Sequence, residues 1–177
     1  MKRFYKLFFI CSIVLILFSF ASCATIPENA VPISDFSLDD YFGTWYEIAR
    51  IDNKYEKSMI YTTASYLLEK NETIRVINSG YSVDKKEWRT ITAIARYRKG
   101  FNIGELKVSF FYPFYTSYNI LAIDDDYSYA LVVGSNLKYL WILSRTTTIP
   151  ENIKEKYLEI AKSLGYNLDK LIWVEQK

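Results

Sequence analysis

Residues 40–50 read DYFGTWYEIAR, and this stretch decides the fold. Its large and small residues alternate as in a β-strand, where successive side chains point to opposite faces. If Trp45 points into the protein, Glu47 and Ala49 point there too, and the residues between them point outward. A strand that turns an indole, a carboxylate and a methyl group to one side does not face a uniformly filled apolar core.

The N-terminal residues predict a secretory signal. Three cations precede an apolar run over residues 7–18, and small residues then lead to Cys23. A helix that spans a membrane needs about 20 apolar residues, so the run is short for a membrane anchor. We therefore expect a signal peptide over residues 1–22.

The end of this segment, FASC, resembles a bacterial lipobox, with Phe20 where Leu is usual. The resemblance implies cleavage before Cys23 and acylation of that residue, and Ala24 in the next position implies the outer membrane. Two or three acyl chains anchor a protein stably where one does not. We expect a lipid-anchored protein of the bacterial outer membrane, with residues 23–37 as a tether and residues 38–177 as one domain.

The composition excludes several classes of function. Loss of residues 1–22 leaves 19 basic against 20 acidic residues, which predicts no basic surface for nucleic acid. The chain has no His, and Cys23 is the only Cys beyond the signal. Histidine-based acid–base catalysis, Cys–His and Ser–His pairs and the usual zinc ligand sets are therefore excluded, and we expect neither a cofactor nor a metal.

Eight short aromatic and β-branched runs alternate with turn-rich pieces such as SVDKKE and DDDYS, which predicts an antiparallel sandwich or barrel. The expected strands are Gly43–Ile51, Ile60–Leu68, Thr73–Tyr81, Trp88–Arg98, Glu105–Phe111, Tyr115–Ile123, Tyr129–Gly134 and Lys138–Ser144.

One amphipathic helix follows the strands. Thr148 and Glu151 have the spacing of a capping box, and Gly165 can end the helix. The helix has one apolar stripe, which we expect to lie on the wall of the strands; it consists of Ile153, Tyr157, Ile160, Ala161 and Leu164. A last short strand, Leu171–Val174, can pair with a strand edge.

The inward residues decide between a sandwich and a barrel. A sandwich fills its middle with bulky apolar groups, whereas a ligand cavity needs small or polar groups at intervals. In the phase that places Trp45 inside, the inward sets mix aromatic rings with Ala and Gly. This mixture favours a barrel with a cavity.

The segment GTWYEIA at 43–49 resembles the G-x-W signature of lipocalins. LKVSFFYPFYTSYNILAID and YLWILSRT resemble strands of the bacterial lipocalin and apolipoprotein D branch, and the resemblance runs from about Leu38 to the C-terminus. It implies an all-β fold, an eight-stranded antiparallel up-and-down barrel with a ligand cavity and a C-terminal helix on its side.

The resemblance also implies structural roles at the closed end of the barrel. Trp45 fills the bottom, Arg145 packs across its indole ring, and Gly43 allows a tight turn. Asp124 matches the Asp of the family's T-D-Y motif, although its neighbours differ from that motif.

Glu47 has two interpretations. A buried carboxylate is unfavourable unless it is paired or protonated. Hydroxyls or a cation deep in the barrel can hold it, or it can select the polar or cationic head of a lipid.

Lipocalins of this branch bind fatty acids and lysophospholipids, which implies a lipid-binding protein for transport, storage or membrane maintenance. The candidate ligand-binding residues are Glu47, Ala49, Ala64, Tyr66, Val76, Asn78, Ala93, Val108, Phe110, Tyr118, Ile120, Ala130, Tyr139 and Trp141. Two alternatives are a structural envelope lipoprotein with a filled barrel and an enzyme that acts on a bound lipid. The aromatic outer faces also allow a homodimer.

Overall fold

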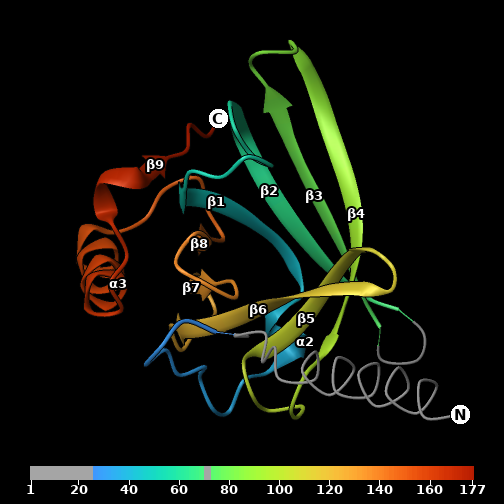
Figure 1. Cartoon of the computed structure of the whole chain (residues 1–177), viewed down its shortest axis with the longest axis vertical. Coiled ribbons are helices and arrows are strands. Elements are labelled where there is room, and N and C mark those ends of the chain that lie inside the picture. The colour runs from blue at the N-terminus through green and yellow to red at the C-terminus, as the bar shows by residue number, and fades with distance from the viewer. Residues whose placement is uncertain (1–25, 70–72) are drawn as a thin grey trace, which may run out of the picture.

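Eight antiparallel strands close into a barrel in the computed structural model, which describes residues 26–69 and 73–177 (Figure 1). The strands run in the order β2-β3-β4-β5-β6-β7-β8-β1, and β1 pairs again with β2. This topology confirms the predicted up-and-down barrel. The strands are β1 (Gly43–Ile51), β2 (Met59–Leu68), β3 (Ile74–Ser82), β4 (Glu87–Tyr97), β5 (Glu105–Phe111), β6 (Phe114–Ile123), β7 (Tyr129–Val133) and β8 (Leu140–Ser144).

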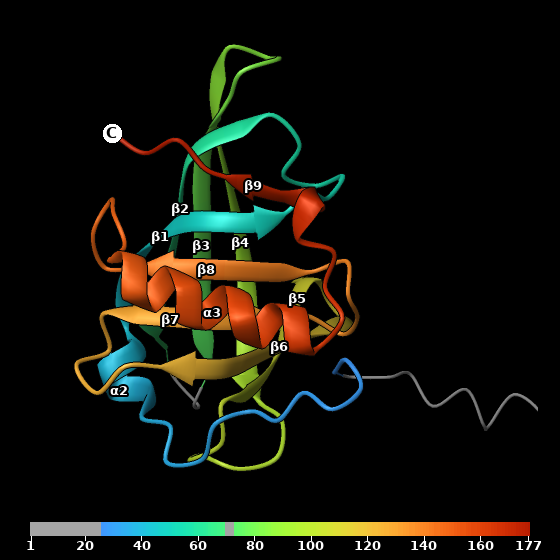
Figure 2. The same cartoon turned by 90° about the vertical axis from the view of Figure 1, so that its left-hand side faces the viewer.

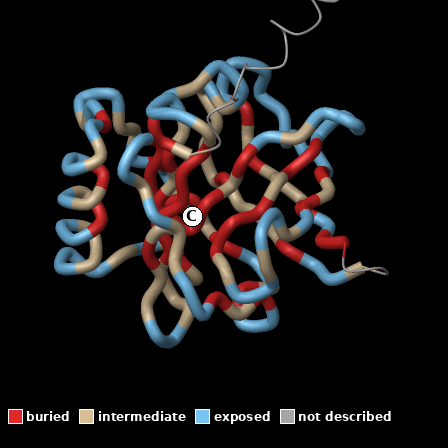
Figure 3. The backbone as a smooth tube through the Cα atoms, turned by 60° about the horizontal axis from the view of Figure 1, so that its bottom comes forward, coloured by how far each residue is buried: buried red, intermediate tan, exposed pale blue. Residues whose placement is uncertain are grey.

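The C-terminal helix α3 (Glu151–Ser163) lies across the outside of β7 and β8 (Figure 2). Tyr157 and Ala161 are buried against the barrel, and the Tyr157 hydroxyl donates to the Tyr129 carbonyl at 2.9 Å. The buried positions of the helix face the barrel in Figure 3, as the apolar stripe predicts. None of the helices within the described ranges is long and apolar enough to cross a membrane.

The predicted capping box of α3 is wrong. Pro150 is the N-cap residue, and no side chain caps the helix. The backbone carbonyl of Thr148 instead accepts bonds from the hydroxyls of Ser144 and Thr146, at 2.9 and 3.0 Å. Thr148 therefore belongs to the turn that follows β8.

The C-terminal residues complete the barrel between β1 and β2. Those two strands pair only from Gly43 to Tyr46 on β1, and the short strand β9 (Leu171–Trp173) pairs with the rest of β1. The Gln176 amide then donates to the carbonyls of Glu47 and Thr62, at 2.7 and 3.0 Å. The chain end thus bridges the two strands where they separate.

The segment before the barrel is partly packed. Helix α2 (Leu38–Tyr41) crosses the closed end and has Ser37 as its N-cap. Upstream, the Ile33 amide donates to the Ile120 carbonyl at 3.0 Å, and Phe36 is buried in the interior cluster. Packing against the barrel therefore includes residues 33–37. Cys23 lies outside the described residues.

Two apolar clusters flank the sheet. One lies inside the barrel and includes Trp45, Val76 and Ile120. The other lies between the outer wall and α3, and includes Ile48, Leu131 and Tyr157. Because both faces of β1, β7 and β8 are covered, these strands are apolar on both sides.

Candidate ligand-binding site

The closed end of the barrel is built around Trp45, which is fully buried. The Arg145 guanidinium lies over the indole ring, with its central carbon 3.8 Å from the ring centroid. Its NH groups donate to three carbonyls of the 40–44 turn, those of Asp40, Thr44 and Phe42, at 2.8–3.0 Å. Arg145 therefore fastens the segment that closes the barrel.

Two further residues of the family motifs shape this end. Gly43 has a φ of +98°, and a Cβ there would lie 3.3 Å from an Arg145 nitrogen, so any other residue would be strained. Asp124 accepts from the backbone amides of Ser128 and Tyr129, at 2.8 and 2.6 Å. This carboxylate holds the β6–β7 turn together.

Three tyrosine hydroxyls meet above Trp45. Tyr66 donates to the Tyr118 hydroxyl at 2.6 Å, and the hydroxyls of Tyr41 and Tyr118 are 2.7 Å apart. Burial raises the pKa of all three phenols above 10, so they are neutral hydrogen-bonding groups. Tyr41 was missed by the sequence analysis, because it lies in α2 before the first strand.

The lower wall of the interior is apolar and buried. The strand register places Val76 beside Tyr66 and Ala93, and Ala95 beside Val108. Of the predicted residues, the interior cluster contains Tyr66, Val76, Ala93, Val108, Ile120 and Ala130. The lining of this half of the barrel is therefore apolar apart from the tyrosine hydroxyls.

The upper half is open to solvent. Asn78 pairs with Ala64 on one side and with Ile91 on the other, and all three continue the inward face of their strands. Asn78 and Ala64 are partly exposed, and Ile91 is 45% exposed. Side chains that face the barrel axis and still contact solvent indicate that the interior is not filled here. Phe110, 37% exposed, lies near this rim.

Three rings line the wall on the side of β6 and β8. Trp141 stacks with Tyr118 and with Tyr139, at centroid distances of 6.4 and 6.1 Å. All three residues are partly exposed. The structure thus brings together three of the predicted residues in one aromatic wall that rises from the tyrosine hydroxyls.

The prediction that Ala49 faces the interior is wrong. The pairing of β1 with β8 shifts between Glu47 and Ala49, so a β-bulge reverses the alternation there. Ala49 is buried in the outer cluster under α3. The same bulge allows Arg50 to reach Glu47.

Glu47 and Arg50 form an ion pair with a distance of 2.8 Å, and Arg50 is only 1% exposed. Arg50 also donates to the carbonyls of Glu56 and Met59, at 2.7 and 3.0 Å. Burial raises the pKa of Glu47 to about 8, the Glu56 carboxylate adds to this, and Arg50 opposes it. A cation thus holds Glu47, one of the two interpretations from the sequence.

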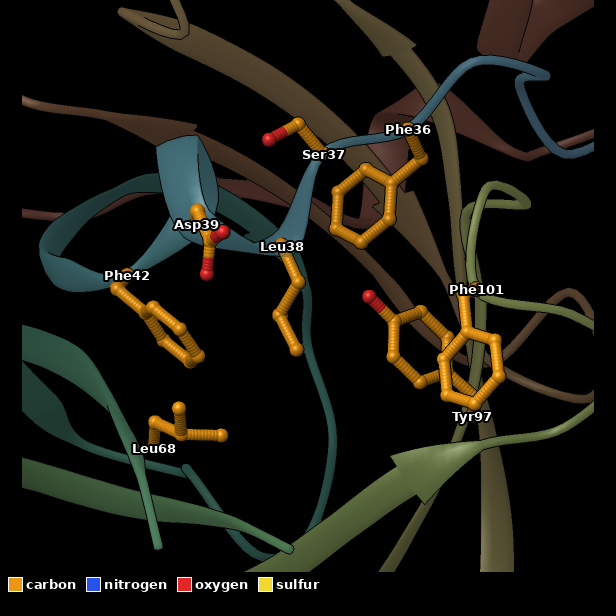
Figure 4. Close-up of a pocket in the computed structure, with 8 residues that line it drawn as sticks. All are labelled: Phe36, Ser37, Leu38, Asp39, Phe42, Leu68, Tyr97 and Phe101. Atoms are coloured by element: carbon orange, nitrogen blue, oxygen red, sulfur yellow. The ribbon is translucent and has the colours of Figure 1, made fainter. Parts of the chain in front are cut away.

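A separate pocket of about 330 Å³ lies at the closed end, near α2 (Figure 4). Leu38, Phe42 and Leu68 border it on one side, and aromatic rings border it on the other (Figure 4). Its lining consists of Phe36, Ser37, Leu38, Asp39, Phe42, Leu68, Tyr97 and Phe101. None of the predicted ligand-binding residues lines it, although Phe36 and Leu38 also belong to the interior cluster.

A closed eight-stranded barrel with a Trp–Arg plug and an accessible upper interior is the architecture of the lipocalin class. The model of the lipocalin-like domain matches residues 36–176, and the chain belongs to this family. It is 42% identical to the outer membrane lipoprotein Blc of Vibrio cholerae over 95% of this chain and 96% of that one. Its identity to Blc of Escherichia coli strain K12 is 41%, over 88% of each chain.

Among solved structures, the fold resembles the cockroach allergen Per a 4, with a TM-score of 0.67 and 21% identity over 86% of this chain and 96% of the allergen. Insecticyanin from the tobacco hornworm gives the same TM-score at 18% identity, over 85% of this chain and 86% of that chain. At this identity the likeness shows the fold alone.

The names of the Blc relatives confirm the predicted location, a lipid-anchored protein of the outer membrane. These relatives are lipoproteins by name. The signal peptide and the acylation of Cys23 lie outside the described residues and stay predictions.

Proposed function

We propose that the barrel binds a single-chain lipid, a fatty acid or a lysophospholipid, with the acyl tail along the lower interior and the head at the open end. Transport, storage and membrane maintenance are the roles that such binding would serve at the outer membrane. The observation that supports this proposal is the gradient inside the barrel. Inward side chains are buried near Ile120, and they are solvent-accessible near Asn78, whose own side chain is polar.

The hydrophobic effect is large enough for this binding. Burial of an acyl chain contributes roughly 0.8 kcal/mol per methylene, so about 14 methylenes contribute about 11 kcal/mol. Association and ordering oppose this by several kcal/mol. Micromolar binding follows from the difference.

Individual residues would have distinct roles. Ala93 and Val76 leave room for the tail because their side chains are small. Trp141 and Tyr118 offer ring surface to the upper part of the chain, and Asn78 and Tyr139 offer hydrogen bonds to the head or to a water molecule. The relatives are lipoproteins and lipocalins by name, and the three phenols bond one another, so binding without chemistry is the simplest function for this interior.

Native mass spectrometry of protein extracted from its own host membranes tests the proposal. We expect a bound mass that corresponds to one single-chain lipid, and its loss after extraction with organic solvent. Protein that is consistently empty would favour the alternative of a structural envelope lipoprotein.

A further inference from the structure

The β1–β2 loop places a carboxylate inside the mouth of the barrel. Glu56, in this loop, accepts from the Trp141 indole NH through both carboxylate oxygens, at 3.3 and 3.1 Å. The Asn53 amide also donates to it. Two neutral donors therefore fix the position of Glu56 against the aromatic wall, and its partial exposure leaves it within reach of a ligand.

Among the described residues, the Glu56 carboxylate forms no ion pair with a cation. Arg50 is the nearest buried cation of the site, and its ion pair is with Glu47; towards Glu56 it bonds only the backbone carbonyl. The ion pairs found among residues 26–69 and 73–177 do not include Glu56. Because the pKa of Glu47 is raised to about 8, Glu47 is largely protonated near pH 7 and adds little negative charge beside Glu56, so the carboxylate that faces the ring wall is that of Glu56.

The aromatic wall supplies the second half of a cation site. Trp141 donates its NH to Glu56, while its ring stacks with Tyr118 and Tyr139. Ring faces carry partial negative charge and attract ammonium groups, and Trp is the strongest of the three rings. A carboxylate at the edge of a partly exposed ring stack provides both charge and ring surface for such a group.

We infer that Glu56, Trp141 and Tyr139 bind a positively charged ammonium group on the head of the lipid, so that the mouth selects ligands by head-group charge. This inference rests on the proposed function, because the acyl tail must occupy the interior for the head to reach the mouth. A lipid with an anionic head would instead meet the Glu56 carboxylate, which repels it, and would bind more weakly.

Two lysophospholipids with the same acyl chain test the inference. Lysophosphatidylcholine carries an ammonium group, and lysophosphatidylglycerol has the same phosphate without one. We expect the full-length protein to bind the choline lipid about tenfold more tightly than the glycerol lipid. This factor corresponds to the energy of a partly desolvated cation–π and ion contact. Lysophosphatidylethanolamine, in a third titration, distinguishes a primary ammonium from a quaternary one as the better ligand.

Variants locate the effect. E56Q keeps the size of the side chain and removes its charge. The ratio of the affinities for the choline and glycerol lipids should therefore fall to about one, chiefly because the choline lipid binds more weakly. The matched control is E175Q, because Glu175 is a carboxylate that bonds the Tyr61 hydroxyl outside the ring stack. This control should keep the ratio of the wild type.

The outcomes separate the two proposals. Binding of the glycerol lipid by E56Q shows that the variant is folded and that the interior still holds a tail. Equal affinities for both lipids in the wild type, or a ratio that E56Q leaves unchanged, would overturn the inference while the proposed function stands. Absence of binding of any single-chain lipid to the wild type would overturn both.

Discussion

The Arg145 guanidinium lies over the buried ring of Trp45 and at the same time bonds three carbonyls of residues 40–44, where α2 leads into β1. One side chain thus joins the start of the first strand to the end of the eighth. Because the two segments are 100 residues apart in the sequence, this contact closes the barrel rather than stabilising one local turn.

R145K tests this relationship. Lys keeps the charge but cannot bond three separate carbonyls from a planar group, so some of these carbonyls, including the partly buried one of Phe42, lose their donor. We expect a loss of about 2–4 kcal/mol in the free energy of unfolding, measured by urea denaturation. R96K, at an exposed position of β4, is the control and should change stability little. Equal stability of both variants would show that the ring contact alone is sufficient.

Glu47 makes the stability depend on pH. Its pKa is raised from 4.5 to about 8 in the folded protein, first by burial and then by Glu56. Between these values the folded protein holds a proton that the unfolded chain has released, so the stability that this proton confers is complete below 4.5 and is lost as the pH rises to 8. From pH 6 to 9 we expect a loss of about 3 kcal/mol at most.

E47Q isolates this contribution, since Gln cannot titrate. The melting temperature of the wild type should fall more between pH 6 and 9 than that of E47Q, whatever the absolute stability of the variant. Parallel curves for the two proteins would mean that Arg50 keeps Glu47 ionised across the whole range.

The alternation of residues in the sequence predicted the strands well. Each of the eight expected ranges overlaps an observed strand, because the turn-rich pieces between them have no competing periodicity. The helix stripe was also right, since Tyr157 and Ala161 face the barrel as the 3.6-residue period requires. The capping box failed because its spacing does not reveal that Pro150 begins the helix.

The site was predictable only where alternation holds. Val76, Ala93 and Ile120 lie inside because no bulge precedes them on their strands. Ala49 does not, and Arg50 takes its place on the inner side, because one extra residue in β1 reverses the phase. Glu56 comes from a loop, where no periodicity exists, and only the closed barrel brings it to Trp141.

Ala93 tests the position of the acyl tail. A93W adds an indole to the buried inner wall and should weaken the binding of a fluorescent fatty acid at least tenfold, the effect of about 1.4 kcal/mol of lost contact. T92W adds the same side chain at an exposed position next in sequence and should bind as the wild type does. Unchanged affinity of A93W would exclude Ala93 from the site.

Cys23 tests the anchor. C23S removes the thiol that the lipobox resemblance assigns to acylation, so the protein should move from the outer-membrane fraction to the soluble fraction of the cell envelope, measured by immunoblotting after fractionation. C11S, within the signal segment, is the control and should leave the protein in the membrane. Retention of C23S at the outer membrane would contradict the lipoprotein assignment.

The chain end tests how the barrel stays closed between β1 and β2. The Gln176 side chain bonds the carbonyls of Glu47 on β1 and Thr62 on β2. The paired part of these two strands ends at Tyr46, so Gln176 links them where they have separated. Q176A removes this bridge and should cost about 1–3 kcal/mol, the usual penalty for acceptors that lose a donor.

The loss should be local, because the lower part of β1 keeps its own pairing with β2 and β8. Hydrogen exchange followed by mass spectrometry should therefore become faster in peptides that cover 47–51 and 59–63, and stay unchanged in β4. E155A, on the exposed side of α3, is the control. If exchange rises equally over all strands, the chain end contributes to the global stability of the barrel. It would then not act locally at the junction between β1 and β2.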